Sequence, residues 1–288
     1  MAKIKIFNEN CFDTMERMEK KDFKVDIILT SPPYNTARTC KTKRSIENYE
    51  NRYDIHLDSM TDEEYGDWTK RLFDVFDNVL SDNGVILYNI SYGSECPDSF
   101  FQAMCQINNN TAFQIADIIT WKKKSALPNN VSPNKLTRIT EFVFVICRRS
   151  EYKTYRANKK VKSVSRTGQK YYENIFNFIE AANNDGPCEL NKATFSTDLC
   201  LQLLEMYSDK DCVVFDPFMG TGTTAVACER YGSDKMWCFG SELSEKQVAH
   251  ANERIETFRK RNPQQPSLFP ELDEPKEETD VASTPIDK

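Results

Sequence analysis

The sequence has few histidines, no closely spaced cysteine pair and no long hydrophobic run. Its two histidines, His56 and His250, form no metal-ligand pattern, which argues against a metal site and against histidine-dependent chemistry. No apolar stretch reaches the roughly 20 residues needed to cross a bilayer, and the segment MAKIKIFNEN lacks the apolar core of a signal peptide. None of the ten cysteines lies in a Cys-x-x-Cys pair, and several fall in apolar segments. These features predict reduced core thiols in a cytoplasmic protein without a membrane partner.

Two nucleotide-binding signatures are also missing. The glycine-rich stretch GTGTT at residues 220–224 is not a Gly-x-Gly-x-x-Gly motif, and it lacks the lysine that a P-loop directs at phosphates. The chain also shows no catalytic histidine or Tyr-Lys arrangement. A nicotinamide-dependent oxidoreductase is therefore disfavoured.

The net charge of −6 conceals an uneven distribution. Residues 148–170 contain nine basic side chains and one acidic one, whereas residues 263–288 contain seven acidic and two basic ones. The C-terminal segment thus supplies −5 of the net charge, and its proline-rich, acidic composition predicts a disordered tail. The basic segment fits a phosphate-binding surface, although charge alone leaves a solvated loop open as the alternative.

Apolar strands alternate with helical patterns along most of the chain, which is typical of an α/β fold around a mostly parallel sheet. Cap residues followed by acids predict a helix start within residues 59–64, and Asn83-Gly84 predicts a turn. Strands are predicted at residues 4–7, 25–29, 85–90, 115–121, 141–147, 212–215 and 235–239, and further helices at 13–20, 98–108, 196–207, 223–231 and 244–260.

The strand at residues 25–29 runs almost directly into Pro32 and Pro33. Proline has no N–H donor and cannot continue a central strand, but its carbonyl is rigidly held. A Pro-Pro pair by itself usually marks an ordinary turn. Ser31 and Tyr34 on either side of this pair make the turn a candidate site.

A second strand, residues 212–215, is followed by Asp216 and then by the glycine-rich stretch and a helix. In doubly wound folds such a turn lets the backbone approach a nucleotide-like ligand at the carboxyl end of a strand. Glu242 ends the next strand, 26 residues after Asp216, where an acid is suited to ribose hydroxyls. The pattern predicts a nucleoside ligand without a pyrophosphate, and S-adenosylmethionine meets this description.

Only one predicted strand follows the glycine-rich stretch, so strands from the first half of the chain must complete the sheet. We therefore expect a doubly wound, circularly permuted sheet. In this arrangement the strand at residues 4–7 lies beside the strand at residues 235–239.

The stretches Ser31-Pro32-Pro33-Tyr34 and Asp216-Pro217-Phe218, in this order, resemble motifs of the amino-group (N4-cytosine/N6-adenine) DNA methyltransferases. The chain is similar to the subgroup with beta-type motif order, whose catalytic motif precedes its cofactor motif. Weaker matches lie at residues 119–122, 140–142 and 192–195, and the resemblance covers about residues 3–258. It implies the doubly wound fold of S-adenosylmethionine-dependent methyltransferases with an inserted target-recognition region.

The resemblance also implies a role for each motif residue. An exocyclic amino group is a poor nucleophile because its lone pair is delocalised into the ring. The Ser31 hydroxyl and the Pro32 carbonyl, held in a rigid turn with Pro33, can accept its hydrogens, and Tyr34 can stack on a base flipped out of the duplex. S-adenosylmethionine is the implied methyl donor, and its binding residues are Asn10 (where the family often has an acid), Phe195, Asp216, Pro217, Phe218, Gly220, Gly222, Thr223 and Glu242.

Within the family, a serine before Pro-Pro is more usual for N4 of cytosine, and an aspartate for N6 of adenine. Ser31 therefore favours cytosine. A hydroxyl can accept a hydrogen bond from either amine, so adenine stays open, as do RNA and a protein amide as substrates. A catalytically silent DNA-binding protein is disfavoured because both motifs are intact.

Basic residues within residues 148–188, aided by residues 122–138 and 36–58, are predicted to bind DNA phosphates. Arg166 and Gln169 are candidates for reading base edges. The predicted DNA-binding residues are Lys122, Lys123, Arg138, Arg148, Arg149, Lys159, Lys160 and Arg166.

The predicted organisation is a catalytic half at residues 1–147, a target-recognition insert at 148–190, a cofactor-binding half at 191–262 and the acidic tail at 263–288. Double-stranded DNA is the implied partner. A cognate restriction endonuclease that shares the target site and a homodimer both remain open.

Overall fold

The computed structural model describes residues 1–35, 60–92, 98–126, 128–186, 188–191 and 194–262. The predicted loop at 36–58 and the predicted acidic tail at 263–288 lie outside these residues.

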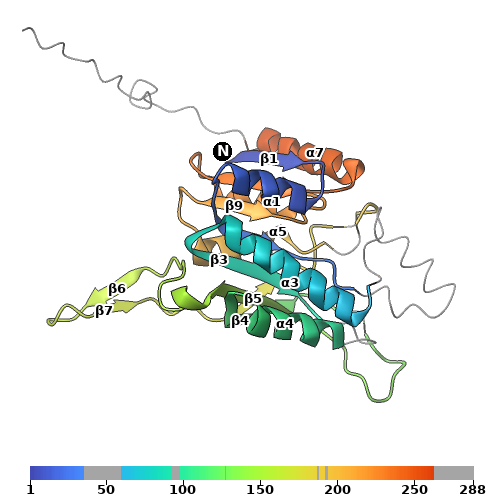
Figure 1. Cartoon of the computed structure of the whole chain (residues 1–288), viewed down its shortest axis with the longest axis horizontal. Helices are drawn as coiled ribbons and strands as arrows, with labels where there is room; N and C mark the ends of the chain where they lie inside the picture. Colours follow the sequence, from blue (N-terminus) through green and yellow to red (C-terminus); the bar gives the residue numbers. More distant parts are fainter. Residues whose placement is uncertain (36–59, 93–97, 127, 187, 192–193, 263–288) are drawn as a thin grey trace, which may run out of the picture.

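An eight-stranded sheet forms the centre of the described structure, in the order β1-β10-β9-β2-β3-β5-β4-β8 (Figure 1). A separate two-stranded sheet pairs β6 with β7. The strands of the main sheet are β1 Lys3–Phe7, β2 Val25–Thr30, β3 Leu80–Ile90, β4 Phe113–Lys123, β5 Thr140–Arg148, β8 Phe178–Ala181, β9 Val213–Asp216 and β10 Trp237–Ser241.

Five neighbouring strands, from β1 to β3 in the sheet order, run parallel, and only β5 runs antiparallel to its neighbours. The predicted mostly parallel sheet is confirmed. The prediction that the strand at residues 4–7 lies beside the strand at residues 235–239 is also confirmed, because β1 pairs with β10 from Lys3↔Trp237 to Phe7↔Ser241. We call the edge that follows Thr30, Asp216 and Ser241 the carboxyl edge, and the opposite edge the amino edge.

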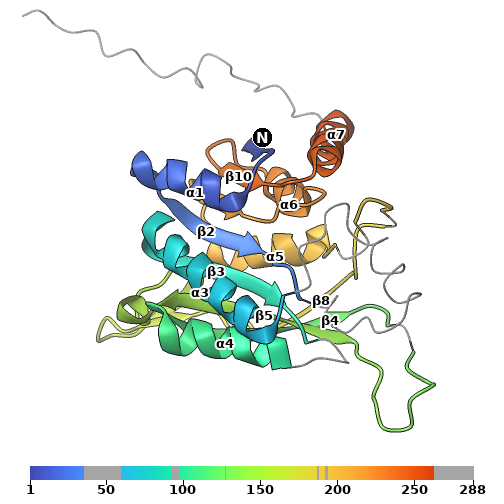
Figure 2. The ribbon, with the colours of Figure 1, turned by 45° about the vertical axis from the view of Figure 1, so that its right-hand side comes forward.

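Helices cover both faces of the sheet (Figure 2). One face carries α1 Cys11–Lys20, α3 Asp62–Val79 and α4 Asp98–Asn110, and the other carries α5 Thr197–Tyr207, α6 Thr223–Tyr231 and α7 Glu245–Arg261.

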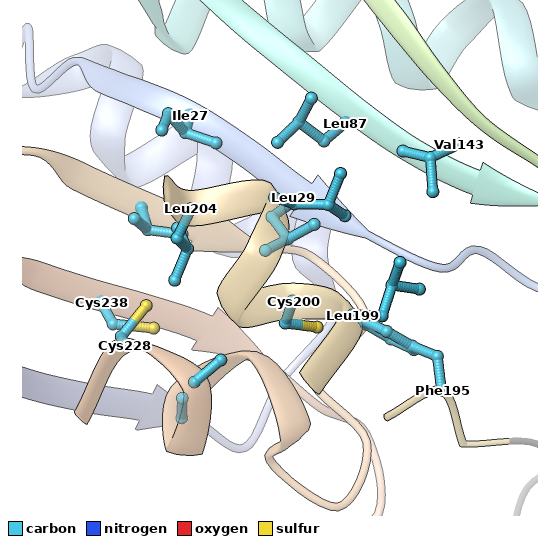
Figure 3. Close-up of a cluster of buried hydrophobic side chains, with 14 of the residues drawn as sticks. Ile27, Leu29, Leu87, Val143, Phe195, Leu199, Cys200, Leu204, Cys228 and Cys238 are labelled. Carbon is cyan, nitrogen blue, oxygen red and sulfur yellow. The ribbon is translucent and has the colours of Figure 1, made fainter. Parts of the chain in front are cut away.

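Strand β2 shows why this chain forms a sheet covered on both faces. Ile27 and Leu29 pack into the core beneath α5, while Val25 and Ile28 pack into the core beneath α1 and α3. Figure 3 shows Leu29 together with Leu87, Val143 and the α5 side chains. A strand that is apolar on both faces is stable only between two layers of helices.

Two local predictions have different outcomes. The predicted helix start is confirmed, because Thr61 and Glu64 form a reciprocal capping box at the start of α3. The predicted turn at Asn83-Gly84 is wrong as an element boundary, because β3 runs through it. The chain instead forms an irregularity: Asn83 has a φ of 58°, and pairing jumps from Val25↔Leu80 to Ile27↔Val85.

The segment after β5 begins at the amino edge. The backbone of Arg156 donates to Asn83, and that of Asn158 donates to Met206 at the end of α5. Strands β6 Val161–Val164 and β7 Lys170–Tyr172 then form an antiparallel arm that projects from the amino edge (Figure 1). The chain returns as β8, which pairs with β4 and belongs to the main sheet. The predicted insert at 148–190 therefore contains one strand of the central sheet.

Six of the eight cysteines that the structure describes are buried, Cys188 is half-buried and Cys105 is exposed. The prediction of core thiols thus holds for most of them but not for Cys105.

Among the helices of the described residues, none is both long and apolar enough to span a bilayer.

Arg148, predicted to bind DNA, contacts the C-terminal end of α3 in this structure. Its guanidinium donates to the backbone carbonyls of Asp77, Leu80 and Ser81 at 2.7–2.9 Å and to the Asp77 carboxylate at 2.5 Å. The last turn of α3 has no basic residue of its own, so Arg148 supplies the cation that favours a helix C-terminus.

Replacement of Arg148 by alanine should lower the free energy of unfolding by about 2–3 kcal/mol, because it leaves carbonyls without their donor. Urea-induced unfolding followed by circular dichroism measures this change. Lys162→Ala, on the exposed face of the arm, is the control and should change stability by less than about 0.5 kcal/mol. An equally small effect of Arg148→Ala would contradict the structural role.

Candidate active site

The turn after β2 is held by contacts from α3 and by an unusual backbone conformation. The Tyr65 hydroxyl donates to the Pro33 carbonyl at 2.7 Å, whereas no described residue donates to the Pro32 carbonyl. Asn35 has a φ of 54°, a left-handed conformation that asparagine tolerates, and its amide donates to the Met60 carbonyl at 2.9 Å. These contacts hold the turn, in which Pro32 is buried.

Ser31 and Tyr34 of this turn are joined to the end of β3. The Ser31 hydroxyl donates to the Tyr34 hydroxyl at 3.1 Å. The Tyr34 hydroxyl lies 3.2 Å from Asn89 Oδ1 and 3.3 Å from the Asn89 carbonyl oxygen. Sequence reasoning assigned Tyr34 only a stacking ring; the structure shows that its hydroxyl is part of the site.

The glycine turn needs its glycines for backbone geometry and for close packing. Gly220 and Gly222 have φ values of 54° and 83°, which favour glycine. A Cβ on Gly222 would lie 2.7 Å from the Cβ of Ala251, so the first turn of α6 approaches α7 too closely for any side chain. These constraints hold the turn beside the end of β10, where the Met219 N–H donates to the Ser241 carbonyl at 2.9 Å.

Glu242, predicted to bind ribose hydroxyls, lies against this turn. One carboxylate oxygen accepts the Gly220 N–H at 2.9 Å, and the other accepts the Ser244 N–H at 2.9 Å. Each carboxylate oxygen can accept more than one hydrogen bond, so both can also accept from the hydroxyls of a ribose.

Asp216 connects the two motifs. It is buried, and its carboxylate accepts from the Thr30 hydroxyl at 2.7 Å, the Thr224 hydroxyl at 2.6 Å and the Phe218 N–H at 3.0 Å. Burial raises the pKa of Asp216 to about 6, and the hydrogen bonds from Thr224, Thr30 and Phe218 oppose this rise. Asp216 therefore acts as a structural link at the carboxyl edge.

The other predicted cofactor residues lie in different surroundings. The ring of Phe218 is half-buried, 5.8 Å from that of Trp68, while Pro217 and Thr223 are buried within the glycine turn. Phe195 is buried beside Leu199 in the core (Figure 3). Asn10 follows β1 at the carboxyl edge, where its side chain accepts from the Phe12 N–H at 3.0 Å and caps α1.

Sequence reasoning missed four residues of this region: Thr30, Tyr65, Trp68 as a site residue, and Asn89. Trp68 stacks on Tyr65 at 5.7 Å between ring centroids and contacts Phe218, although its helical spacing suggested a core residue. Asn89 carried a usable signal, because it is a buried amide within the apolar stretch VILYNI.

The predicted DNA-binding residues do not gather on one surface. Lys122, Lys123 and Arg138 lie at the carboxyl edge, where they contact Glu180, Glu141 and the Tyr92 carbonyl in turn. Arg148 and Arg149 lie at the amino edge and donate to backbone carbonyls of their own chain. Lys159, Lys160 and Arg166 are exposed on or beside the arm, which projects from the amino edge (Figure 1).

Thr224→Val should destabilise the protein more at high pH than at low pH. Asp216 holds its proton more tightly in the folded chain than in the unfolded one, so its ionisation lowers stability as the pH rises from about 4 to about 6. The bond from Thr224 favours the ionised form. Its loss should therefore cost about 1 kcal/mol more at about pH 8 than at about pH 5, measured by urea unfolding.

Thr69→Val is the matched control, because the buried Thr69 hydroxyl donates at 2.7 Å to the Tyr65 carbonyl, which does not titrate. Its cost should be the same at both pH values. A cost of Thr224→Val that is likewise independent of pH would contradict the role given to Asp216.

Comparison with known proteins identifies the family. The family model for DNA methylases of the N6/N4 type matches residues 25–253. The orphan methyltransferase M.BamHII of Bacillus amyloliquefaciens is 25% identical over 270 residues, which cover 82% of this chain and 91% of that protein. The type II methyltransferase M.SmaI of Serratia marcescens is 24% identical over 84% of this chain and 88% of that protein.

Two solved structures share the fold. The PvuII DNA methyltransferase (cytosine-N4-specific) superposes with a TM-score of 0.62 at 16% identity, over 91% of this chain and 93% of that one. The complex of M1.HpyAVI with SAM superposes with a TM-score of 0.57 at 19% identity, over 87% and 99%. The predicted resemblance and the predicted mostly parallel fold of S-adenosylmethionine-dependent methyltransferases are confirmed. Since the family model spans most of the chain, the protein belongs to the N6/N4 DNA methylase family.

Proposed function

We propose that this chain transfers a methyl group to N4 of a cytosine that has been flipped out of double-stranded DNA. One observation carries the proposal: the catalytic turn and the glycine turn leave neighbouring parallel strands at the same edge, joined by the Thr30–Asp216 hydrogen bond. In doubly wound folds this edge is where ligands bind. A base held by the first turn therefore faces a cofactor held by the second.

S-adenosylmethionine is the methyl donor in this family, and the residues present fit it. Glu242 offers carboxylate oxygens beside the glycine turn, and the half-buried ring of Phe218 lies in the same turn. We propose that Glu242 binds the ribose hydroxyls and that Asn10, Phe195, Phe218 and the glycine turn hold the remainder of the molecule. When bound, S-adenosylmethionine supplies an electrophilic methyl group.

The chain itself must make a planar amino group nucleophilic. In the proposed mechanism the Ser31 hydroxyl oxygen and the Pro32 carbonyl accept the two amino hydrogens, which draws the nitrogen lone pair out of the ring. With the donor bound, the nitrogen would bond to its methyl carbon as the carbon–sulfur bond breaks, and the methylated nitrogen would then lose one proton to solvent. Because the methyl group moves directly, positioning and local electrostatics carry the catalysis.

Cytosine is proposed as the target base because Ser31 stands before Pro32-Pro33, and within the family a serine at this position is more usual for N4 of cytosine. The PvuII methyltransferase, which shares the fold, is named as cytosine-N4-specific. We further propose that the protein acts in the cytoplasm. A cognate restriction endonuclease that shares the target site stays open, because one relative is named a type II methyltransferase and another an orphan methyltransferase.

We propose that the DNA backbone lies along the carboxyl edge, against Lys122, Lys123 and Arg138. These residues are near the end of β3, next to the site, and they carry the positive charge that phosphates need. Lys159, Lys160 and Arg166 on the opposite edge would contact only DNA that extends well beyond the flipped base.

Incubation of the protein with methyl-labelled S-adenosylmethionine and DNA amplified in vitro should yield labelled N4-methylcytosine, identified by mass after digestion to nucleosides. Ser31→Ala should lower the rate by at least about tenfold, because one acceptor for the amino group is lost. Labelled N6-methyladenine would retain the mechanism but overturn the choice of base. Absence of label in DNA, with S-adenosylmethionine still bound, would point to RNA or a protein amide.

Lys122→Gln should weaken DNA binding and lower the slope of log affinity against log salt by about 0.9, the value for one lost phosphate contact. Fluorescence anisotropy with a duplex at several salt concentrations measures both. Lys20→Gln is the matched control, because Lys20 is also exposed and paired with a glutamate but lies at the far end of α1. If Arg166→Gln lowers the slope and Lys122→Gln does not, DNA binds along the arm instead.

A further inference from the structure

A serine hydroxyl can activate an amino group only if its oxygen, and not its hydrogen, faces that group. Its hydroxyl can donate as well as accept a hydrogen bond. If the Ser31 hydrogen pointed at the substrate, two donors would face each other and the amino group would not be activated. The site therefore needs an acceptor that takes up the hydroxyl hydrogen of Ser31 on the side away from the base.

The structure contains a chain of hydrogen bonds whose direction is set at its far end. The amide nitrogen of Asn89 donates to the Phe142 carbonyl at 3.1 Å, and Asn89 is fully buried. A backbone carbonyl can only accept. The opposite orientation of the amide would place two oxygens against each other, so the amide nitrogen must face Phe142 and Oδ1 must face the site.

This orientation determines the next bond in the chain. The Tyr34 hydroxyl lies within 3.3 Å of two oxygens of Asn89, the side-chain Oδ1 and the backbone carbonyl. Both are acceptors, so Tyr34 must donate its hydrogen toward Asn89. The Tyr34 oxygen is then the acceptor for the Ser31 hydroxyl, 3.1 Å away.

We propose that Asn89 and the Tyr34 hydroxyl are positioning residues that orient Ser31 as a hydrogen-bond acceptor for the substrate amino group. The bonds run in one direction, from the amino group to Ser31, then to Tyr34, Asn89 and the Phe142 carbonyl. This role rests on the proposed function and is separate from the stacking assigned to the Tyr34 ring. No proton is transferred along these hydrogen bonds. They only fix which lone pairs of the Ser31 hydroxyl face the base.

Tyr34→Phe tests the proposal, because it keeps the ring and removes the hydroxyl. It should lower kcat for methyl transfer to DNA amplified in vitro by about tenfold, with the KM for DNA and the affinity for S-adenosylmethionine within about twofold of the native values. Tyr231→Phe is the matched control, since Tyr231 also donates to a backbone carbonyl, that of Ser208, and lies on the helix α6 away from the catalytic turn. Its kcat should equal that of the native protein.

A double-mutant cycle distinguishes positioning from a structural effect. In a Ser31→Ala background, where no hydroxyl remains to be oriented, Tyr34→Phe should cause no further loss in single-turnover methyl transfer. The same fold-loss in both backgrounds would overturn the proposal, as would a native rate for Tyr34→Phe. Asn89→Leu, if it folds, should repeat the Tyr34→Phe pattern. Full activity of Ser31→Ala would instead show that the proposed function of Ser31 is at fault.

Discussion

The pairing of β2 with β9 is the constraint on which the rest of the site depends. The two strands are parallel, with Ile27 opposite Val214 and Ile28 opposite Phe215, so their carboxyl ends emerge side by side. The buried bond between Thr30 and Asp216 then joins residues 186 positions apart in the chain. Because Thr30 precedes Ser31 and Asp216 begins the glycine turn, this one bond fixes the proline turn relative to the glycine turn.

The neighbouring strands extend this arrangement on both sides. Strand β10 brings Glu242 against the glycine turn, and β3 brings Asn89 against Tyr34. Helix α3 contributes Tyr65, which holds the Pro33 carbonyl. Each of these residues follows or faces the carboxyl edge, so the sheet fixes the positions of these groups relative to one another.

Much of this could be predicted from sequence because it depends on local chemistry. Strands that are apolar on both faces, a proline pair after β2 and a glycine turn after β9 each have a local physical cause, and they indicate the fold and the two halves of the site. The contacts of Thr30 and Asn89 could not be predicted, because their partners lie far away along the chain. Nor could composition show which edge a charged segment occupies: residues 148–170 are strongly basic, yet Arg148 binds carbonyls at the end of α3 and the arm leaves from the amino edge.

A crystal structure with S-adenosylmethionine bound would test the central claim most directly. The account predicts that the methyl carbon points into the space between the Ser31 hydroxyl and the Pro32 carbonyl, leaving room for an amino nitrogen at a reactive distance of about 3–3.5 Å. It also predicts that Glu242 contacts the ribose. A methyl group directed away from Ser31, or a cofactor bound elsewhere than the turn between Asp216 and Thr224, would contradict it.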